Sequence, residues 1–140
     1  MDRFELMVGD WVMRTDVKDP YPVQILEIKE YSVVVDNQHG NTVILDYTDL
    51  QPIPITREFL LKENFIEQEN RDFKTFYNQV CFGDKVDYTI IFETEEGSDS
   101  DRIIYSIIEH EAFLYNNPMY YIHEFQHVLK LSNINYEIKL

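Results

Sequence analysis

The sequence predicts an α+β protein. We expect a small amino-terminal β-barrel of the SH3-like kind, a connecting helix, and an antiparallel sheet covered by a carboxyl-terminal helix. Three observations predict this class. Short β-rich segments separated by turn residues fill residues 8–56, strands rich in aromatic and β-branched residues recur between 72 and 110, and a helical pattern follows Asn117-Pro118. With 140 residues, 44% of them hydrophobic, the chain can form one core or two small subdomains.

The amino-terminal half, residues 1–55, is predicted to form the barrel-like subdomain. Gln38-His39-Gly40 indicates a hairpin turn, because Asn37 and Gly40 both tolerate positive φ. Trp11 begins a strand, and we interpret it as a core aromatic residue rather than an exposed binding platform. The prolines of 51–54 force an extended backbone and mark the boundary. The predicted strands are 9–14, 21–30, 31–37 and 41–47.

The second subdomain, residues 56–140, is predicted to open with a short helix over 56–65 that Thr56 caps. Three antiparallel strands follow, and a fourth is allowed. Asn117 is a favourable cap and Pro118 a favourable first residue for a helix over 118–131. The strands are expected at 72–82, 85–93 and 101–110, and the core is expected to include Val33, Val35, Ile44, Ile90, Ile104, Phe125 and Val128.

The charge of the chain restricts its partners. The 26 acidic and 12 basic residues give a formal charge of -14, which repels nucleic acids and anionic membranes, so we expect neither as a direct partner. The single cysteine, Cys81, favours a reducing compartment, and the start of the chain does not resemble a signal peptide. We therefore expect a cytoplasmic protein. The acidic segment 93–101 lacks the ligand spacing of a calcium loop and is interpreted as a solvated hairpin tip.

The most specific chemical pattern is His123-Glu124-Phe125-Gln126-His127, which matches the zinc-peptidase motif H-E-x-x-H. Histidines four residues apart lie side by side on a helix, and Glu124 would act as the general base of a zinc-dependent hydrolase. Projection at 100° per residue places both histidines and Gln126 opposite the apolar stripe. The alternative interpretation is that His123 and His127 are two exposed side chains of an amphipathic helix.

A catalytic zinc also needs a third protein ligand and a water molecule. The sixth residue after His127 is Asn133, where one zinc-peptidase class has its third histidine. Glu109, His110 and Glu111 would alternate between two faces of a strand, and Glu137 lies in a terminal segment that resembles a strand. We therefore favour the exposed-histidine interpretation, with no metal and no catalytic residue. The zinc site of His123, His127 and one of these glutamates remains the alternative.

Two segments carry a resemblance to a known group. The sequences DLQPIPITREFLLKENF (49–65) and YYIHEFQHVLKLSNINYEI (120–138) resemble those of small uncharacterised proteins of Bacteroidales genomes and their prophages. In that group His123 and Gln126 have counterparts, glutamine and asparagine replace Glu124 and His127, and glycine replaces Asn64. The resemblance implies no known activity. It does favour a non-enzymatic accessory or interaction protein of a mobile element or its host, with an unidentified protein partner.

Overall fold

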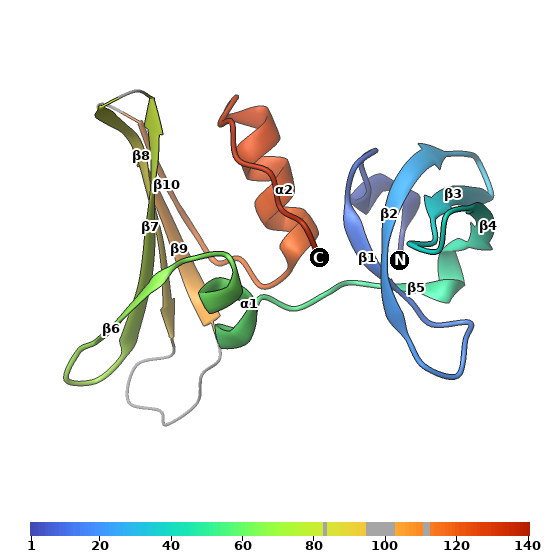
Figure 1. Cartoon of the computed structure of the whole chain (residues 1–140), viewed down its shortest axis with the longest axis horizontal. Helices are drawn as coiled ribbons and strands as arrows, with labels where there is room; N and C mark the ends of the chain where they lie inside the picture. Colours follow the sequence, from blue (N-terminus) through green and yellow to red (C-terminus); the bar gives the residue numbers. More distant parts are fainter. Residues whose placement is uncertain (83, 95–102, 111–112) are drawn as a thin grey trace. The chain divides into compact units, whose positions relative to one another are not determined.

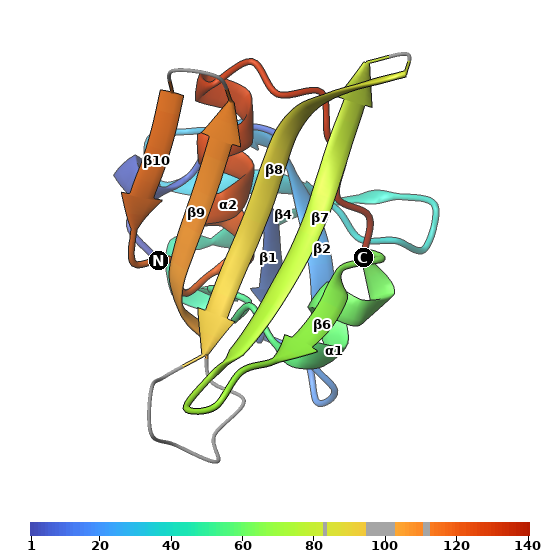
Figure 2. The ribbon, with the colours of Figure 1, turned by 90° about the vertical axis from the view of Figure 1, so that its left-hand side faces the viewer.

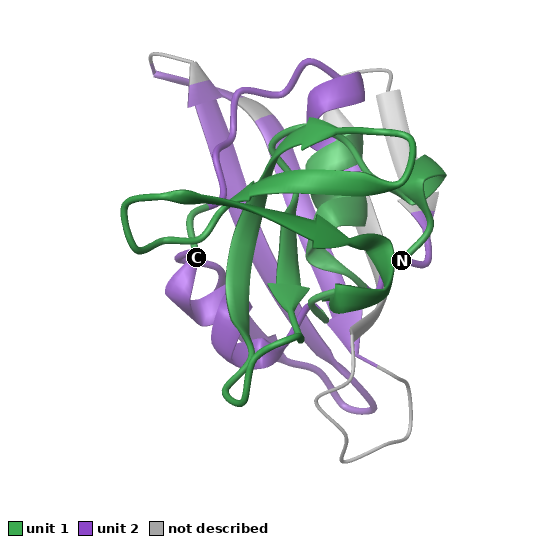
Figure 3. Ribbon diagram, turned by 90° about the vertical axis from the view of Figure 1, so that its right-hand side faces the viewer, with its two compact units in different colours: residues 1–54, 121–128, 139–140 green, residues 55–120, 129–138 purple. Residues whose placement is uncertain are grey.

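The structure is a computed structural model that describes residues 1–82, 84–94, 103–110 and 113–140. Within these ranges, only the backbone is described at residues 82, 87, 103–107, 109–110 and 113–116. Figure 1 labels its helices and strands. The described chain forms two units, coloured separately in Figure 3. Unit 1 contains residues 1–54, 121–128 and 139–140, and unit 2 contains residues 55–120 and 129–138. The first division lies one residue from the predicted boundary, whereas residues 121–128 belong to the unit of the amino-terminal half.

Unit 1 is built on a five-stranded antiparallel sheet with the strand order β4-β3-β2-β1-β5. The described strands form an open sheet, so a closed barrel is not confirmed. The predicted turn is present, and Gly40 has positive φ (87°) as expected, but the other positive φ is at Gln38 (65°) and not at Asn37. Asn37 instead caps the turn by accepting the N–H of His39. The elements are η1 (Arg3–Glu5), β1 (Trp11–Arg14), β2 (Tyr21–Ile28), β3 (Ser32–Asp36), β4 (Thr42–Asp46), η2 (Tyr47–Asp49) and β5 (Leu50–Gln51).

The core of unit 1 lies on one face of this sheet. Val33 and Val35 are fully buried there, as predicted. The prediction for Ile44 is wrong, because its side chain is 64% exposed. The β3–β4 register places Ile44 opposite Val34 on the outer face, while its neighbours Val43 and Leu45 face the core. The buried core residues are Leu6, Val12, Val23, Ile25, Val33, Val35, Leu45 and Leu50.

Unit 2 contains a second antiparallel sheet, with the order β10-β9-β8-β7-β6, whose strands lie side by side in Figure 2. It has five strands rather than the expected three or four, because the short strands β6 and β10 pair with the two edges. The helix α1 (Arg57–Lys62) begins as predicted, with the Thr56 hydroxyl accepting the N–H of Phe59. The strands are β6 (Ile66–Glu69), β7 (Lys74–Phe82), β8 (Lys85–Thr94), β9 (Ile103–His110) and β10 (Phe113–Asn117).

Apolar residues from both α1 and the sheet are buried in unit 2. Ile90 is fully buried, as predicted. The side chain of Ile104, which was predicted to lie in the core, is not among the described side chains. Residues 95–101, which make up most of the predicted acidic tip, also lie outside the described residues. Asn64 ends the α1 turn with φ 64°, a left-handed conformation that asparagine tolerates better than most residues. The buried apolar residues of unit 2 are Ile55, Phe59, Leu60, Phe65, Phe76, Ile90, Phe92, Ile108, Met119, Leu129, Ile134 and Ile138.

The carboxyl-terminal helix α2 spans Ile122–Leu131. Its predicted start at residue 118 is wrong, because Asn117 is the last residue of β10 and pairs with Ser106. Phe125 is fully buried, as predicted, and Val128 is only half-buried. Residues 135–140 form no strand in the described range 113–140. No helix among the described residues is long and apolar enough to cross a membrane.

Candidate functional site

The residues of the H-E-x-x-H match lie in the first two turns of α2. The helix begins where the N–H of Ile122 donates to the carbonyl of Ile53 (2.9 Å) and the N–H of Tyr121 donates to Oε2 of Glu124 (3.0 Å). Free N–H groups at a helix amino terminus favour a nearby carboxylate, both by hydrogen bonding and through the helix dipole. Glu124 therefore caps α2 with its carboxylate. The hydrolase interpretation needs this same carboxylate as its general base.

Gln126 binds the backbone of the turn before β1 with both ends of its amide. Its Oε1 accepts the N–H of Trp11 (2.8 Å), and its Nε2 donates to the carbonyl of Gly9 (2.9 Å). Gly9 has φ 97°, a conformation that other residues adopt only with strain. Its carbonyl also accepts the Nε2 of Gln24 (3.0 Å). Gln126 thus holds the Gly9–Trp11 turn against α2 within unit 1.

His127 pairs with the carboxylate between those two backbone contacts. Its Nε2 lies 2.7 Å from Oδ2 of Asp10. An ionised carboxylate only accepts hydrogen bonds, so the ring donates from Nε2. The N–H of Met7 donates to the same oxygen (2.7 Å). The Asp10 side chain is 3% exposed and that of His127 is 19% exposed. A charge as buried as Asp10 needs such partners, which makes this contact costly to break.

His123 is buried, with 5% of its surface exposed. Its ring stacks on Tyr121 (centroids 5.9 Å apart) and meets the ring of His127 edge-on (5.6 Å). Among the described residues, its Nδ1 has no hydrogen-bond partner. Burial lowers the pKa of His123 below its ordinary value, while the nearby carboxylates of Asp10 and Glu124 act in the opposite direction.

The prediction that both histidines lie on an exposed helix face is therefore wrong. The Gly9–Trp11 turn contacts the polar side of α2 through Gln126 and His127, so this side is not a solvent face. The sequence contained one sign of this contact, which was Asp10. It is a carboxylate directly before the start of a strand, and strands usually exclude aspartate. Gln126 gave no comparable signal, because an amide on the polar side of a helix is ordinary.

The described side chains of the H-E-x-x-H match are engaged in contacts other than metal binding. Within the described part of the chain, no group of three histidine, cysteine or acidic side chains is placed to hold a metal ion. Glu137 is exposed, Glu109 and His110 are described by backbone only, and Glu111 lies outside the described residues. His127 uses its Nε2 on Asp10, and Glu124 uses its carboxylate on the helix start.

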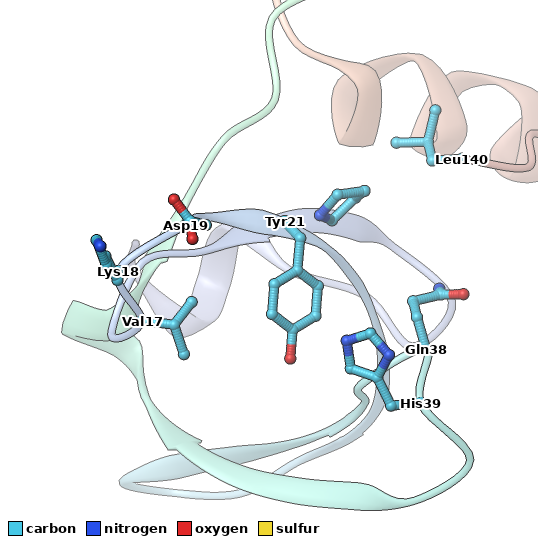
Figure 4. Close-up of a pocket in the computed structure, with 8 residues that line it drawn as sticks. Val17, Lys18, Asp19, Tyr21, Gln38, His39 and Leu140 are labelled. Atoms are coloured by element: carbon cyan, nitrogen blue, oxygen red, sulfur yellow. The ribbon is translucent and has the colours of Figure 1, made fainter.

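Unit 1 also has an open cavity of about 650 Å³, shown in Figure 4. The rings of Tyr21 and His39 lie 5.2 Å apart at a tilt of 58° in its wall. Arg14 donates to the Tyr21 hydroxyl (3.0 Å) and pairs with Asp16, which lowers the pKa of the Asp16 carboxyl. The cavity offers one ammonium and one carboxylate beside the two rings. It is lined by Val17, Lys18, Asp19, Tyr21, Pro22, Gln38, His39 and Leu140.

Comparison of the chain with protein-family models, with curated proteins and with solved structures found no match.

Proposed function

We propose that the protein is a non-enzymatic interaction protein and that its H-E-x-x-H match maintains the fold. The contact that carries this proposal is the pair of His127 Nε2 and Asp10 Oδ2 at 2.7 Å, with the carboxylate almost fully buried. A histidine in such a pair contributes to stability, because removing it leaves an uncompensated buried charge. The association with a mobile element rests on the resemblance of residues 49–65 and 120–138 alone.

The contacts made by Glu124, Gln126 and His127 also weaken the alternative function, a zinc-dependent hydrolase. The peptidase mechanism needs an open metal position and a glutamate free to take a proton from water. Here Glu124 accepts a backbone N–H, and Gln126 and His127 hold the Gly9–Trp11 turn. The resembling group implies asparagine in place of His127. Asparagine is not a usual zinc ligand.

A binding role is supported by the surface of unit 1. Its exposed apolar side chains include Tyr31 (78%) and Ile44 (64%), which contribute nothing to its core. The formal charge of -14 favours a protein partner with a basic surface over nucleic acid or an anionic membrane. We therefore expect the partner to be a basic protein of the same cell.

The test combines metal analysis with affinity capture. The full chain, purified without a histidine tag, should hold no stoichiometric zinc and should not cleave casein or a random peptide library. As bait in a host lysate, it should capture the same protein in replicate experiments. His127→Gln should capture that protein equally well, because the glutamine amide can place a donor where Nε2 meets Asp10. One zinc per chain, together with peptide cleavage abolished by Glu124→Gln, would replace this proposal with the hydrolase.

A further inference from the structure

The strand β4 is an edge of the unit 1 sheet and pairs only with β3 among the described strands. The pairing runs without a register shift from Ser32–Asp46 to Asp36–Thr42. Edge strands in soluble proteins usually carry a lysine, a proline or a bulge that prevents further pairing. β4, with the sequence Thr-Val-Ile-Leu-Asp, has none of these in its interior. Its edge is therefore unusually open to an added strand.

The hydrogen-bond pattern shows which backbone groups point outward. The N–H of Asn37 donates to the carbonyl of Asn41 (3.1 Å) at the hairpin end. Antiparallel pairs alternate between bonded and non-bonded, so Val43 and Leu45 use their backbone groups on β3. Thr42 and Ile44 then direct their N–H and C=O groups away from β3. The next such N–H, that of Asp46, agrees with this assignment, because it donates to Oδ2 of Asp49 (3.3 Å).

The side chains beside this edge are apolar in the middle and mainly acidic around it. Ile44 is 64% exposed, and its cross-strand neighbour Val34 is half-buried on the same outer face. Four charged residues share that face by register, and three of them are acidic: Asp46 on β4, Asp36 on β3 and Glu27 on β2, with Lys29 directly after β2 as the one basic residue. We use the name β4 edge for the exposed side of Thr42, Ile44 and Asp46 together with Val34.

We propose that the β4 edge binds an extended segment of a partner protein as an additional antiparallel or parallel strand. The segment carries an apolar side chain beside Ile44 and lysine or arginine on both sides of it. Backbone pairing supplies the affinity and the alternating side chains supply the specificity. This inference rests on the proposed interaction function and identifies its surface.

Charge decides between a basic partner and a second copy of this chain. A second copy would bring the same acidic side chains and another formal charge of -14 to the β4 edge. A segment with basic flanks instead faces Glu27, Asp36 and Asp46 with opposite charge, which favours encounter and fixes its register.

The experiment uses the ¹⁵N-labelled full chain and the synthetic peptide acetyl-Thr-Lys-Thr-Ile-Thr-Lys-Thr-amide, whose two lysines share one strand face with its isoleucine. The peptide should shift the amide resonances of Thr42 and Ile44 and slow hydrogen exchange at the Ile44 N–H. A peptide with glutamate in place of every lysine should do neither. Ile44→Lys should weaken binding of the basic peptide by about tenfold or more. Ile66→Lys is the matched control, since Ile66 is 56% exposed on the edge strand β6 of unit 2.

A second variant separates backbone pairing from simple apolar contact. Thr42→Pro removes an outward N–H at the first residue of β4 and keeps the Ile44 side chain, so the β3–β4 ladder and the folded spectrum should persist while binding is lost. The inference is overturned if the basic peptide causes no shifts at about 1 mM, or if the shifts lie away from β4. Self-association that Ile44→Lys abolishes would also overturn it, in favour of a second copy. If a partner captured from the lysate binds Ile44→Lys as tightly as the unaltered chain, the β4 edge is refuted while the interaction function stands.

Discussion

The replacement Gln126→Ala tests how much of the stability depends on the contact between α2 and the Gly9–Trp11 turn. It leaves the buried N–H of Trp11 without its acceptor, which should cost about 1 to 3 kcal/mol. It also removes one of two donors to the Gly9 carbonyl, and because Gln24 remains at 3.0 Å, this loss should add only about 0.5 to 1.5 kcal/mol. We expect a total loss of about 1.5 to 4.5 kcal/mol in the free energy of unfolding.

The measurement is urea denaturation followed by tryptophan fluorescence. Trp11 is the only tryptophan of the chain and lies in the turn itself, so its emission reports directly on this contact. Gln51→Ala is the matched control, because Gln51 is an exposed glutamine of β5 in the same unit, and it should stay within about 0.5 kcal/mol of the unaltered chain. A loss below about 0.5 kcal/mol for Gln126→Ala would show that the contact does not stabilise the protein.

Three further results are expected. Phe125→Ala removes a fully buried ring and should cost about 3 to 5 kcal/mol in urea denaturation; a loss below about 1 kcal/mol would mean that the helix face is wrongly assigned. Glu124→Ala should cost about 1 kcal/mol through the lost cap, whereas Glu124→Gln keeps an acceptor for Tyr121 and should cost less; equal losses would argue against capping. Burial lowers the pKa of His123 in the folded state, so the unfolded chain takes up a proton first as the pH falls through about 6.5, and stability should fall below that pH. In thermal unfolding at several pH values, His123→Phe should flatten this fall, and an unchanged profile would assign it to other groups.

Local signals in the sequence predicted much of the secondary structure. The Thr56 cap, the positive φ of Gly40 in the hairpin turn, and the β-branched strands each follow from the conformational preference of a few neighbouring residues. The prediction that Ile44 lies in the core was wrong because the local sequence is ambiguous. Val43, Ile44 and Leu45 are all apolar, so alternation does not decide which of them faces the core, and only pairing with β3 does.

The candidate site depends on contacts that no local pattern contains. Gln126 and Trp11 are 115 residues apart in the sequence, and the helical projection records only that Gln126 is polar. The helix start shows the same limit, because Asn117-Pro118 is a favourable cap locally, yet Asn117 pairs with Ser106 and ends a strand instead. A match to a short motif such as H-E-x-x-H likewise does not decide whether its side chains bind a metal ion or form hydrogen bonds with other parts of the fold.

The most direct test of the account is a double-mutant cycle between Asp10 and His127, with Asp10→Ala, His127→Ala and the double variant compared by urea denaturation at pH 7 in the presence of a chelator. The two side chains meet at 2.7 Å and the carboxylate is buried, so we expect a coupling free energy of about 1 to 3 kcal/mol, unchanged when zinc replaces the chelator. A coupling below about 0.3 kcal/mol, or stability that rises with added zinc only while His123 and His127 are both present, would contradict the structural role of this motif.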